Sequence, residues 1–495
     1  MKPDAITDLS AEALSNAIHA RRVSCREVMQ AYLARIDTLN PHFNAIVSRA
    51  PHEALLAQAD ERDAELAPRR SAPGSRGWMH GLPQAIKDTG NAVGFPTTFG
   101  SPLLAQAYPA QDSVFVQRMK AAGCIVVGKT NMPEFGLGSH TYNPLFGPTG
   151  NAWDPSVSAG GSSGGAAVAL AQRMLPVADG SDFMGSLRNP AAWNHVFGLR
   201  PSQGRVPAWP KPELWVAQLG TDGPMARTVR DLAALLSTQA GHDPRAPLSL
   251  SDAPRSFVPT ARTVATAAQG ARIGWLGSLG GHLELEPGIA DACQAALAHF
   301  IAAGARVEDT ALGFDAAKLW DAWLVWRRAL VTPSVAAVMH LPDARSRIKP
   351  EALWEHDRGQ DLAFMDFQKA SQVRSAFYQH MVSLFERYDA LALPVAQVWP
   401  FALEETWPRQ INGRDMDTYH RWMESTLYAT FAGLPAISIP AGFDATGRWP
   451  AGLQLIGKPQ GDAELLALAA AYEARATALL ARRPPPPSNT PPRLP

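Results

Sequence analysis

The feature that most constrains the fold is an alternation of short apolar runs with helical patterns between residues 82 and 180. The apolar runs read LPQAIKD, CIVVGKT and LPVADG, and helical patterns at 111–122 and 165–173 separate them. Strands that alternate with helices indicate strand–helix–strand units, which place parallel strands in one sheet. We therefore expect a large α/β domain with a mainly parallel sheet.

The rest of the chain predicts one domain over residues 1–482 and an extended tail over 483–495. Helical patterns cover 8–40 and 51–66, and helices dominate about 288–390. The tail reads RPPPPSNTPPRLP, which cannot form a helix or a central strand. No fixed-period repeat and no long linker divides the chain into two folding units.

Charge and cysteine content limit the partners that the protein is expected to bind and the compartment in which it is expected to occur. Lysine plus arginine and aspartate plus glutamate both number 45, so no net charge attracts nucleic acid or an anionic membrane. No apolar run approaches the ~20 residues that a membrane helix needs. The N-terminal stretch MKPDAITDLSAEAL lacks the apolar region of a secretory signal, and three scattered cysteines fit a reducing compartment. We expect a cytoplasmic protein.

The stretch GCIVVGKT, residues 123–130, matches the P-loop pattern G-x-x-x-x-G-K-[ST]. In a P-loop the four variable residues form a tight phosphate-binding turn, but here they are Cys124–Val127, an apolar and largely β-branched run typical of a buried strand. Gly123 is placed to end the preceding helix, and Pro133 argues against an uninterrupted helix from Lys129. We interpret Lys129 as a structural or loop residue, Cys124 as core, and reject the NTPase hypothesis.

Two glycine- and serine-rich segments, 158–166 and 180–190, are the richest candidates for a functional site. They read SAGGSSGGA and GSDFMGSLRNP, with a helical pattern between them. Glycine allows close approach of the backbone to a ligand, and a helix N-terminus directs free N–H groups toward an anion. Such a site could hold a phosphate or the oxyanion of an acyl-transfer intermediate. From composition alone, a flexible loop is an equal alternative.

These segments resemble the amidase signature family, serine hydrolases with a Ser–cis-Ser–Lys triad. GGSSGG is followed by D-x-x-x-S-L-R-x-P, and further stretches in family order are similar to the family's motifs: GLPQAIKD (81–88), GKTNMPEF (128–135), GPMARTV (223–229), GLPA (433–436) and GLQLIG (452–457). The resemblance covers nearly the whole chain. It implies the amidase signature fold, a large mixed and mainly parallel sheet sandwiched between helices, with a helical variable region.

The resemblance also implies the catalytic residues, position by position. Ser186 takes the place of the nucleophile, Ser162 that of the cis-serine, and Lys87 that of the base. A serine hydroxyl needs a base to accept its proton, and lysine can serve only when its pKa of about 10.4 is lowered enough to leave it neutral. Ser162 would relay the proton between them. The resulting acyl-enzyme on Ser186 would be hydrolysed by water, with no metal and no cofactor.

Neighbouring residues take supporting roles in this interpretation. The successive amides of residues 183–186, Phe183, Met184, Gly185 and Ser186, would form the oxyanion hole. Ser163 would support the loop by hydrogen bonding, and Asp182 with Arg188 would form a structural ion pair beside the nucleophile.

Two other groups of residues have a structural and a functional interpretation. His140 and His195 lie near the motifs, but the triad needs no histidine, so we assign them polar loop or core roles. Tryptophans 320, 323 and 326 recur at helical spacing, and we expect core packing, with a wall of a bulky substrate pocket as the alternative.

One departure from the family bears on the substrate. The family has Gly-Gly-Ser at the nucleophile, whereas this chain has Met184-Gly185-Ser186, and the Met184 side chain is expected to reach the acyl pocket. The stretch is similar to that of 6-aminohexanoate cyclic dimer (nylon-oligomer) hydrolases and broad-range bacterial amidases and urethanases. We expect a monomeric or homodimeric amidohydrolase for a small or oligomeric amide, linear or cyclic, extending to esters, anilides and carbamates. The alternative is the glutaminase subunit of a tRNA-dependent amidotransferase.

Overall fold

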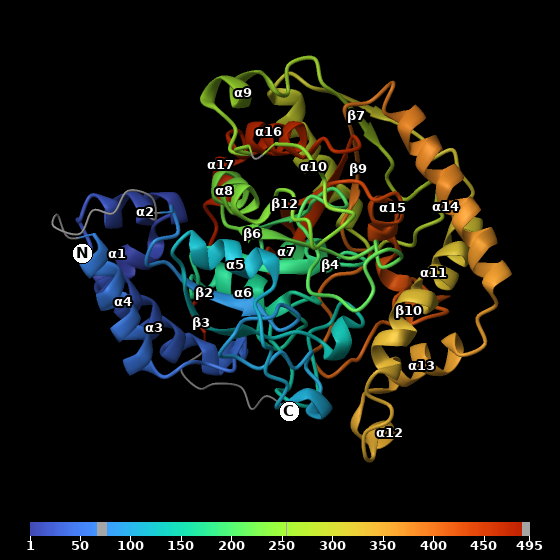
Figure 1. The fold of residues 1–495 in the computed structure, drawn as a ribbon. Coiled ribbons are helices and arrows are strands. Elements are labelled where there is room, and N and C mark those ends of the chain that lie inside the picture. The colour runs from blue at the N-terminus through green and yellow to red at the C-terminus, as the bar shows by residue number, and fades with distance from the viewer. Residues whose placement is uncertain (67–76, 254, 488–495) are drawn as a thin grey trace.

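The computed structural model describes residues 1–66, 77–253 and 255–487, and its first part is helical (Figure 1). The helices are α1 (Pro3–Asp8), α2 (Ala11–His19), α3 (Cys25–Phe43) and α4 (His52–Glu65). The helical pattern of residues 8–40 is interrupted between α2 and α3. There the Ser24 hydroxyl accepts from the Glu27 N–H while the Glu27 carboxylate accepts from the Ser24 N–H, a capping box that starts a new helix.

An eight-stranded sheet forms the centre, in the order β4-β6-β5-β12-β13-β9-β7-β8. Its strands are β4 (Ala178–Asp182), β5 (Phe197–Arg200), β6 (Thr221–Ala226), β7 (Arg272–Trp275), β8 (Arg306–Asp309), β9 (Ala390–Pro394), β12 (Ala436–Phe443) and β13 (Pro450–Gly457). The mixed α/β class is confirmed, but the expectation of mainly parallel pairing is wrong. Only β7 pairs in parallel, with β8 and β9, and the other five described pairs are antiparallel. Short links such as residues 444–449 join β12 to β13 as a hairpin, which forces antiparallel pairing.

The parallel unit predicted from LPQAIKD and CIVVGKT lies in a separate three-stranded sheet, ordered β1-β3-β2. Its strands are β1 (Ile46–Val47), β2 (Pro83–Lys87) and β3 (Ile125–Thr130), and α5 (Val114–Ala121) connects β2 to β3. The pair β2 and β3 is parallel, as a strand–helix–strand unit requires. Gly123 follows α5 with φ +103°, so the P-loop-like stretch is a helix end followed by a buried strand, as predicted.

The large sheet separates two hydrophobic cores, as alternate residues of β9 show. Ala390 and Ala392 belong to a core shared with α3, α6, α8, α10 and α16. Leu391 and Leu393 belong to a second core shared with α11 (Ala316–Ala336), α14 (Phe364–Leu384) and α15. Successive strand residues point to opposite faces, so apolar packing covers the sheet on both sides. The covering helices are α6 (Gly164–Ala171), α7 (Arg188–Trp193), α8 (Val229–Gln239), α9 (Ala261–Thr266), α10 (Ile289–Ala302), α15 (Leu427–Phe431), α16 (Asp462–Glu473) and α17 (Thr477–Leu480).

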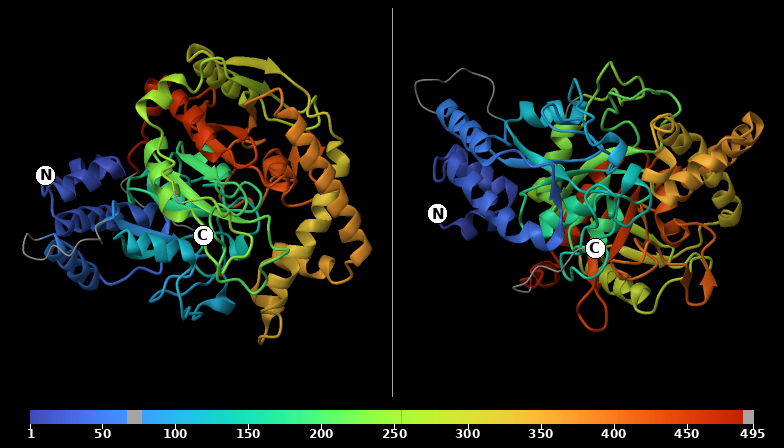
Figure 2. Two further views of the ribbon diagram at one scale, coloured as in Figure 1. Left: turned by 45° about the horizontal axis from the view of Figure 1, so that its top comes forward. Right: turned by 90° about the horizontal axis from the view of Figure 1, so that it is seen from below.

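The tryptophan-rich region is helical, and it lies at the opposite end of the molecule from α1–α4 (Figure 2). Its helices are α11 (Ala316–Ala336), α12 (Ala344–Arg347), α13 (Pro350–Gly359) and α14 (Phe364–Leu384). The remaining short elements are the 3₁₀ turns η2 (Pro102–Leu104), η3 (Glu134–Gly136) and η4 (Arg421–Thr426) and the strands β10 (Gln410–Ile411) and β11 (Arg414–Asp415). Residues 483–487 of the predicted tail form neither helix nor strand, and residues 488–495 lie outside the described residues. The single domain over 1–482 stays a prediction.

Candidate active site

Lys87 is the last residue of β2, and its side chain is buried among hydroxyl groups. Its Nζ lies 2.7 Å from Ser162 Oγ, 2.9 Å from Ser163 Oγ and 2.9 Å from Ser181 Oγ, with the Ser181 carbonyl oxygen at 3.3 Å. Lys87 is 1% exposed. The structure therefore brings the predicted base together with the predicted cis-serine and the predicted loop-supporting serine.

The glycine- and serine-rich segment 158–166 brings Ser162 to Lys87 and then starts α6. The peptide bond between Gly161 and Ser162 is cis, as the resemblance implied. Glycine is required in the first turn of α6, because a Cβ on Gly165 would lie 2.4 Å from the Ala45 carbonyl oxygen and 2.5 Å from the Asn131 nitrogen. The segment is therefore packed tightly against its neighbours, and the interpretation as a flexible loop is wrong.

The loop that connects β4 to α7 carries Ser186, and the Asp182 side chain holds its backbone through hydrogen bonds. The Asp182 carboxylate accepts the Gly185 N–H at 2.8 Å and the Leu187 N–H at 3.2 Å. Arg188 binds the same carboxylate through Nε and Nη2, each at 3.0 Å. Arg200 adds a bond of 2.6 Å from Nη1 to the Asp182 carbonyl oxygen. Asp182 and Arg188 thus form the predicted structural ion pair, and it fixes the backbone on both sides of Ser186.

The pKa of Asp182 reflects these partners. Burial favours the neutral acid, but the guanidinium groups of Arg188 and Arg200 outweigh burial and hold the pKa well below its usual range. The carboxylate stays ionised at any physiological pH, so the bonds that shape the loop persist.

The predicted oxyanion hole needs one correction. Gly185 has φ +88° and its N–H is committed to Asp182, so it is not a free donor. Among the described residues, the N–H groups of Phe183, Met184 and Ser186 have no acceptor in the chain. The amide of Gly185 shapes the loop, and the three other amides are available to a ligand.

Ser186 is connected to the loop that carries Ser162 and Ser163 through its backbone carbonyl oxygen. The Ser163 N–H donates to the Ser186 carbonyl oxygen at 3.1 Å, so the two loops that carry Ser162 and Ser186 are tied side by side. Ser186 is 6% exposed, and its hydroxyl makes no hydrogen bond within the described chain. A catalytic hydrogen bond that is open without substrate can close in the substrate complex.

Burial lowers the pKa of the Lys87 ammonium to about 7, although three nearby carboxylates oppose the shift. These carboxylates are Asp222, Asp182 and Asp179. Burial also raises the pKa of Asp179 to about 6 and raises that of Asp222. Near neutral pH a substantial fraction of Lys87 is therefore a neutral amine, the form that can accept a proton.

The sequence interpretation missed two residues that contact Lys87. Ser181 meets its Nζ, and Asp179 accepts the Lys87 backbone N–H at 3.1 Å, which ties the small sheet to β4 of the large one. Ser181 and Asp182 are adjacent in GSDFMGS, and alternation along β4 could have placed Ser181 beside the other segment. Nothing in the sequence indicates that Asp179 contacts Lys87, because the partner of an acidic residue in a strand depends on which segment lies beside that strand in the fold.

An apolar wall stands beside the free amides. The Phe183 ring contacts Trp323 of α11, with ring centroids 5.4 Å apart, and Arg327 one turn later lies 5.6 Å from the Phe183 ring. The three tryptophans 320, 323 and 326 are all buried, so the core interpretation is confirmed. Met184 is 1% exposed and shares their apolar cluster. Trp323 also packs on Phe183 of the candidate oxyanion loop, so the same tryptophan contributes to the core and to the wall of the pocket.

The remaining candidates have structural partners. His140 Nδ1 lies 2.7 Å from Ser158 Oγ and its Nε2 lies 3.1 Å from the Leu403 carbonyl oxygen, while His195 Nε2 lies 3.0 Å from the Leu479 carbonyl oxygen. Burial lowers the pKa of both histidines to about 4. Burial raises the pKa of the Cys124 thiol to about 12, which leaves it unreactive.

None of the helices in the described ranges has the length and apolar character needed to cross a membrane.

Comparisons with known proteins show which family and which relatives this chain resembles. A family model described as Amidase matches residues 27–466. An acylamidase of Rhodococcus erythropolis is 33% identical over 483 residues, which cover 94% of this chain and 95% of the relative. A glutamyl-tRNA(Gln) amidotransferase subunit of Chromohalobacter salexigens is 31% identical over 490 residues, covering 94% of this chain and 96% of that relative.

Solved structures of similar fold include further amide-hydrolysing enzymes. A bacterial aryl acylamidase of the amidase signature family superposes with a TM-score of 0.87 at 29% identity, covering 96% of this chain and 99% of that one. A 6-aminohexanoate cyclic dimer hydrolase complexed with substrate superposes with a TM-score of 0.83 at 27% identity, covering 96% and 98% of the two chains.

Proposed function

Because the chain belongs to the amidase family and is an amide-hydrolysing enzyme, we propose that it acts through an acyl-enzyme on Ser186, with Ser162 as proton relay and Lys87 as base. The observation that carries the proposal is the 2.7 Å contact between Lys87 Nζ and Ser162 Oγ in a buried site where burial brings the pKa of Lys87 to about 7. A neutral amine beside a hydroxyl can accept its proton.

The first half-reaction follows from this arrangement. Ser186 Oγ attacks the carbonyl carbon and gives its proton to Ser162 Oγ, which passes its own proton to Lys87 Nζ. The free N–H groups of Phe183, Met184 and Ser186 would stabilise the oxyanion, a contribution of roughly 3–4 kcal/mol per donor. The proton then returns through Ser162 to the leaving nitrogen, and the C–N bond breaks.

The second half-reaction uses the same path in reverse. Water attacks the acyl carbon while its proton passes through Ser162 to Lys87, and the Ser186 oxygen leaves as it regains a proton. The carboxylic acid is released and Lys87 returns to the neutral state. No step needs a metal or a cofactor.

For the substrate, we propose a small or oligomeric carboxylic amide, linear or cyclic, with a large apolar acyl or amine portion. Support comes from the aromatic wall of Phe183 and Trp323 and from the likeness to an aryl acylamidase and a cyclic dimer hydrolase. Anilides, esters and carbamates fit the same acyl-enzyme chemistry. We further propose a cytoplasmic monomer or homodimer that needs no nucleic acid or membrane.

The test of the nucleophile is mass spectrometry of the intact protein mixed with a panel of amides, anilides, esters and carbamates. We expect an acyl group on the peptide that contains Ser186, and no adduct in Ser186→Ala. Ser383→Ala, an exposed serine on α14, is the matched control and should acylate normally. An adduct elsewhere, or full turnover by Ser186→Ala, would refute the assignment.

A second function is favoured by the 31% identity to the glutamyl-tRNA(Gln) amidotransferase subunit, namely glutaminase activity inside a multi-subunit complex. Met184 beside the nucleophile and the tryptophan-rich helices favour the stand-alone enzyme. Turnover of amides by the purified chain supports the first function. If the chain hydrolysed only glutamine, and did so only when partner subunits were present, the second function would be supported.

A further inference from the structure

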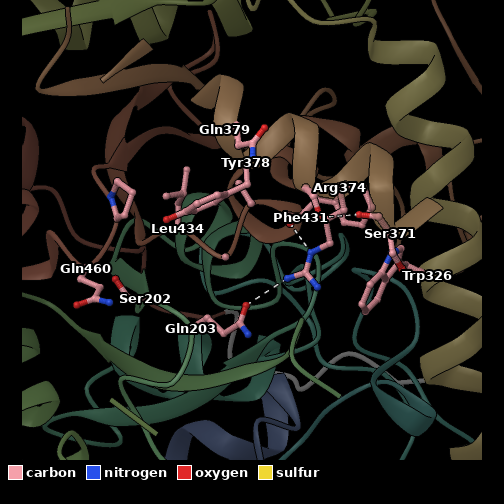
Figure 3. A pocket seen from close by; sticks show the side chains of 14 residues that line it. Ser202, Gln203, Trp326, Ser371, Arg374, Tyr378, Gln379, Phe431, Leu434 and Gln460 are labelled. Atoms are coloured by element: carbon pink, nitrogen blue, oxygen red, sulfur yellow. Dashed lines mark hydrogen bonds between the residues drawn. The ribbon is translucent and has the colours of Figure 1, made fainter. Parts of the chain in front are cut away.

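A cavity of about 480 Å³ opens between α14, the loop after β5 and the segment that joins α15 to β12 (Figure 3). None of Lys87, Ser162 or Ser186 lines it. Its walls include the aromatic side chains of Trp326, Tyr378 and Phe431, and Arg374 is the one charged residue among the described residues that line it. A concave cavity that combines aromatic side chains with a few polar groups and one charged group has the usual form of a small-molecule site.

Arg374 is held in this cavity by neutral groups. Its Nε donates to the Phe431 carbonyl oxygen at 2.8 Å, and its Nη2 donates to Gln203 Oε1 at 3.2 Å (Figure 3). The guanidinium carbon lies 4.6 Å from the centre of the Trp326 ring. Among the described residues, no carboxylate pairs with it. Burial lowers the pKa of Arg374 to about 10 without an opposing acidic group.

Two buried carboxylates near the cavity, those of Asp462 and Asp182, already have hydrogen-bond and ion-pair partners other than Arg374. Asp462 accepts from the N–H and hydroxyl of Ser202 and from Arg205 Nε. Asp182 pairs with both Arg188 and Arg200. Arg374 also acts on Arg200, whose pKa burial lowers to about 10 with a further contribution from the Arg374 charge. Two guanidinium groups therefore share the Asp182 carboxylate, and the Arg374 guanidinium beside the cavity has no carboxylate partner among the described residues.

We propose that this cavity binds a small organic monocarboxylate with an aromatic or apolar body. The carboxylate would pair with the Arg374 guanidinium, whose planar donors match it. The body would lie against the aromatic walls. One guanidinium favours a monoanion over a phosphate, which carries more charge than this cavity would neutralise.

The experiment is isothermal titration calorimetry of the full chain with benzoate, in a buffer of neutral or cationic components, with benzyl alcohol as the uncharged probe of similar shape. Arg374→Gln removes the charge, and Lys369→Gln removes an exposed charge from the same helix as the matched control. Ser375→Phe fills the cavity from an exposed helix position while leaving Arg374 in place, so the test survives if Arg374→Gln does not fold.

We expect wild type and Lys369→Gln to bind benzoate equally and benzyl alcohol far more weakly. Arg374→Gln should weaken benzoate roughly tenfold to a hundredfold, the effect of one charged hydrogen-bonded contact. Ser375→Phe should weaken it at least as much. Absence of benzoate binding, or binding unchanged in Arg374→Gln and Ser375→Phe, would overturn the proposal. Binding is read without turnover, so the result is independent of the proposed catalysis.

Discussion

Lys87 and Lys129 stand near the ends of the paired strands β2 and β3, and both side chains are almost completely buried, at 1% and 0% exposure. Their partners differ. Lys129 Nζ donates to the Gly90 carbonyl oxygen at 2.7 Å and lies 3.4 Å from Asp88. Lys87 Nζ meets three serine hydroxyls.

The difference in partners separates a structural lysine from a reactive one. Carbonyl and carboxylate oxygens only accept. The one hydroxyl near Lys129 Nζ, that of Thr97 at 3.3 Å, donates its own proton to the Gly90 carbonyl oxygen and so also accepts from Lys129. The Lys129 site is therefore satisfied by an ammonium with three N–H donors. A hydroxyl can also donate into the lone pair of a neutral amine, so the Lys87 site accommodates either protonation state. Burial is common to both sites, and the hydrogen-bonding character of the neighbours decides which lysine can carry a proton in catalysis.

The largest effect is expected from Lys87→Met, which keeps the size of the side chain but removes the amine. Turnover of a p-nitroanilide substrate should fall by about 10⁴-fold or more, because the Ser186 hydroxyl loses its base. Circular dichroism should show an intact fold. A variant that keeps more than a tenth of wild-type turnover would contradict the role of Lys87.

Lys129→Met should act on stability instead. It leaves Asp88 buried without its cation, and breaking a buried pair in this way costs about 3–5 kcal/mol of unfolding free energy. Denaturant unfolding measures this loss, and turnover per folded molecule should stay within a few-fold of wild type.

The double variant Lys129→Met with Asp88→Asn sharpens this prediction. Removing the carboxylate charge as well should recover part of the lost stability, since the two residues are coupled. If Lys129→Met abolished turnover in protein that remained folded, the contrast between the two lysines would fail.

The pH dependence is the next effect in size. The neutral amine of Lys87 is the competent base, so kcat/KM should rise with pH and level off above about 7. Below that value it should fall about tenfold per pH unit, to roughly a hundredth at pH 5. Stopped assays across pH 5–9, with fluorescence to confirm folding, provide the measurement. A rate independent of pH over this range would exclude a base that titrates near 7.

Ser163→Ala should produce the smallest effect. The Ser163 hydroxyl lies 2.9 Å from Lys87 Nζ and accepts the Ser181 N–H at 3.3 Å, so it positions Lys87 without passing a proton. Loss of one such hydrogen bond, about 1 kcal/mol, predicts a fall in kcat of about fivefold. Ser162→Ala is the comparison, and should cost far more. Equal losses in the two variants would make Ser163 part of the proton relay.

Parts of the fold and site followed from local sequence because they depend on short-range rules. The run Cys124–Val127 is apolar and mostly β-branched, and the strand that it predicts begins at Ile125, while Gly123 ends the preceding helix as its sequence position predicts. The triad was placed by motif resemblance, and the structure brings Lys87 and Ser162 into contact across 75 residues of chain.

Other features depend on which segments meet after folding. The mainly parallel sheet was wrong because pairing direction follows from connections over the whole chain, and most strands of the large sheet run antiparallel. The prediction that the Gly185 amide is a free donor is wrong because the fold places the Asp182 carboxylate within hydrogen-bonding distance of it. The contact of Ser181 with Lys87 has the same origin, since alternation along β4 orients the Ser181 side chain but only the fold brings Lys87 of β2 beside it.

Local residue chemistry thus decided the start of the strand Ile125–Thr130, the helix boundaries at Ser24 and Gly123, and the kinds of group that could react. Folding decided which lysine lies among hydroxyls, which amides remain free, and that Arg374 has no carboxylate partner within the described part of the chain. The physical reason is range. Backbone propensities and caps act within a few residues, whereas desolvation, charge pairing and donor–acceptor matching depend on atoms brought together from distant parts of the chain.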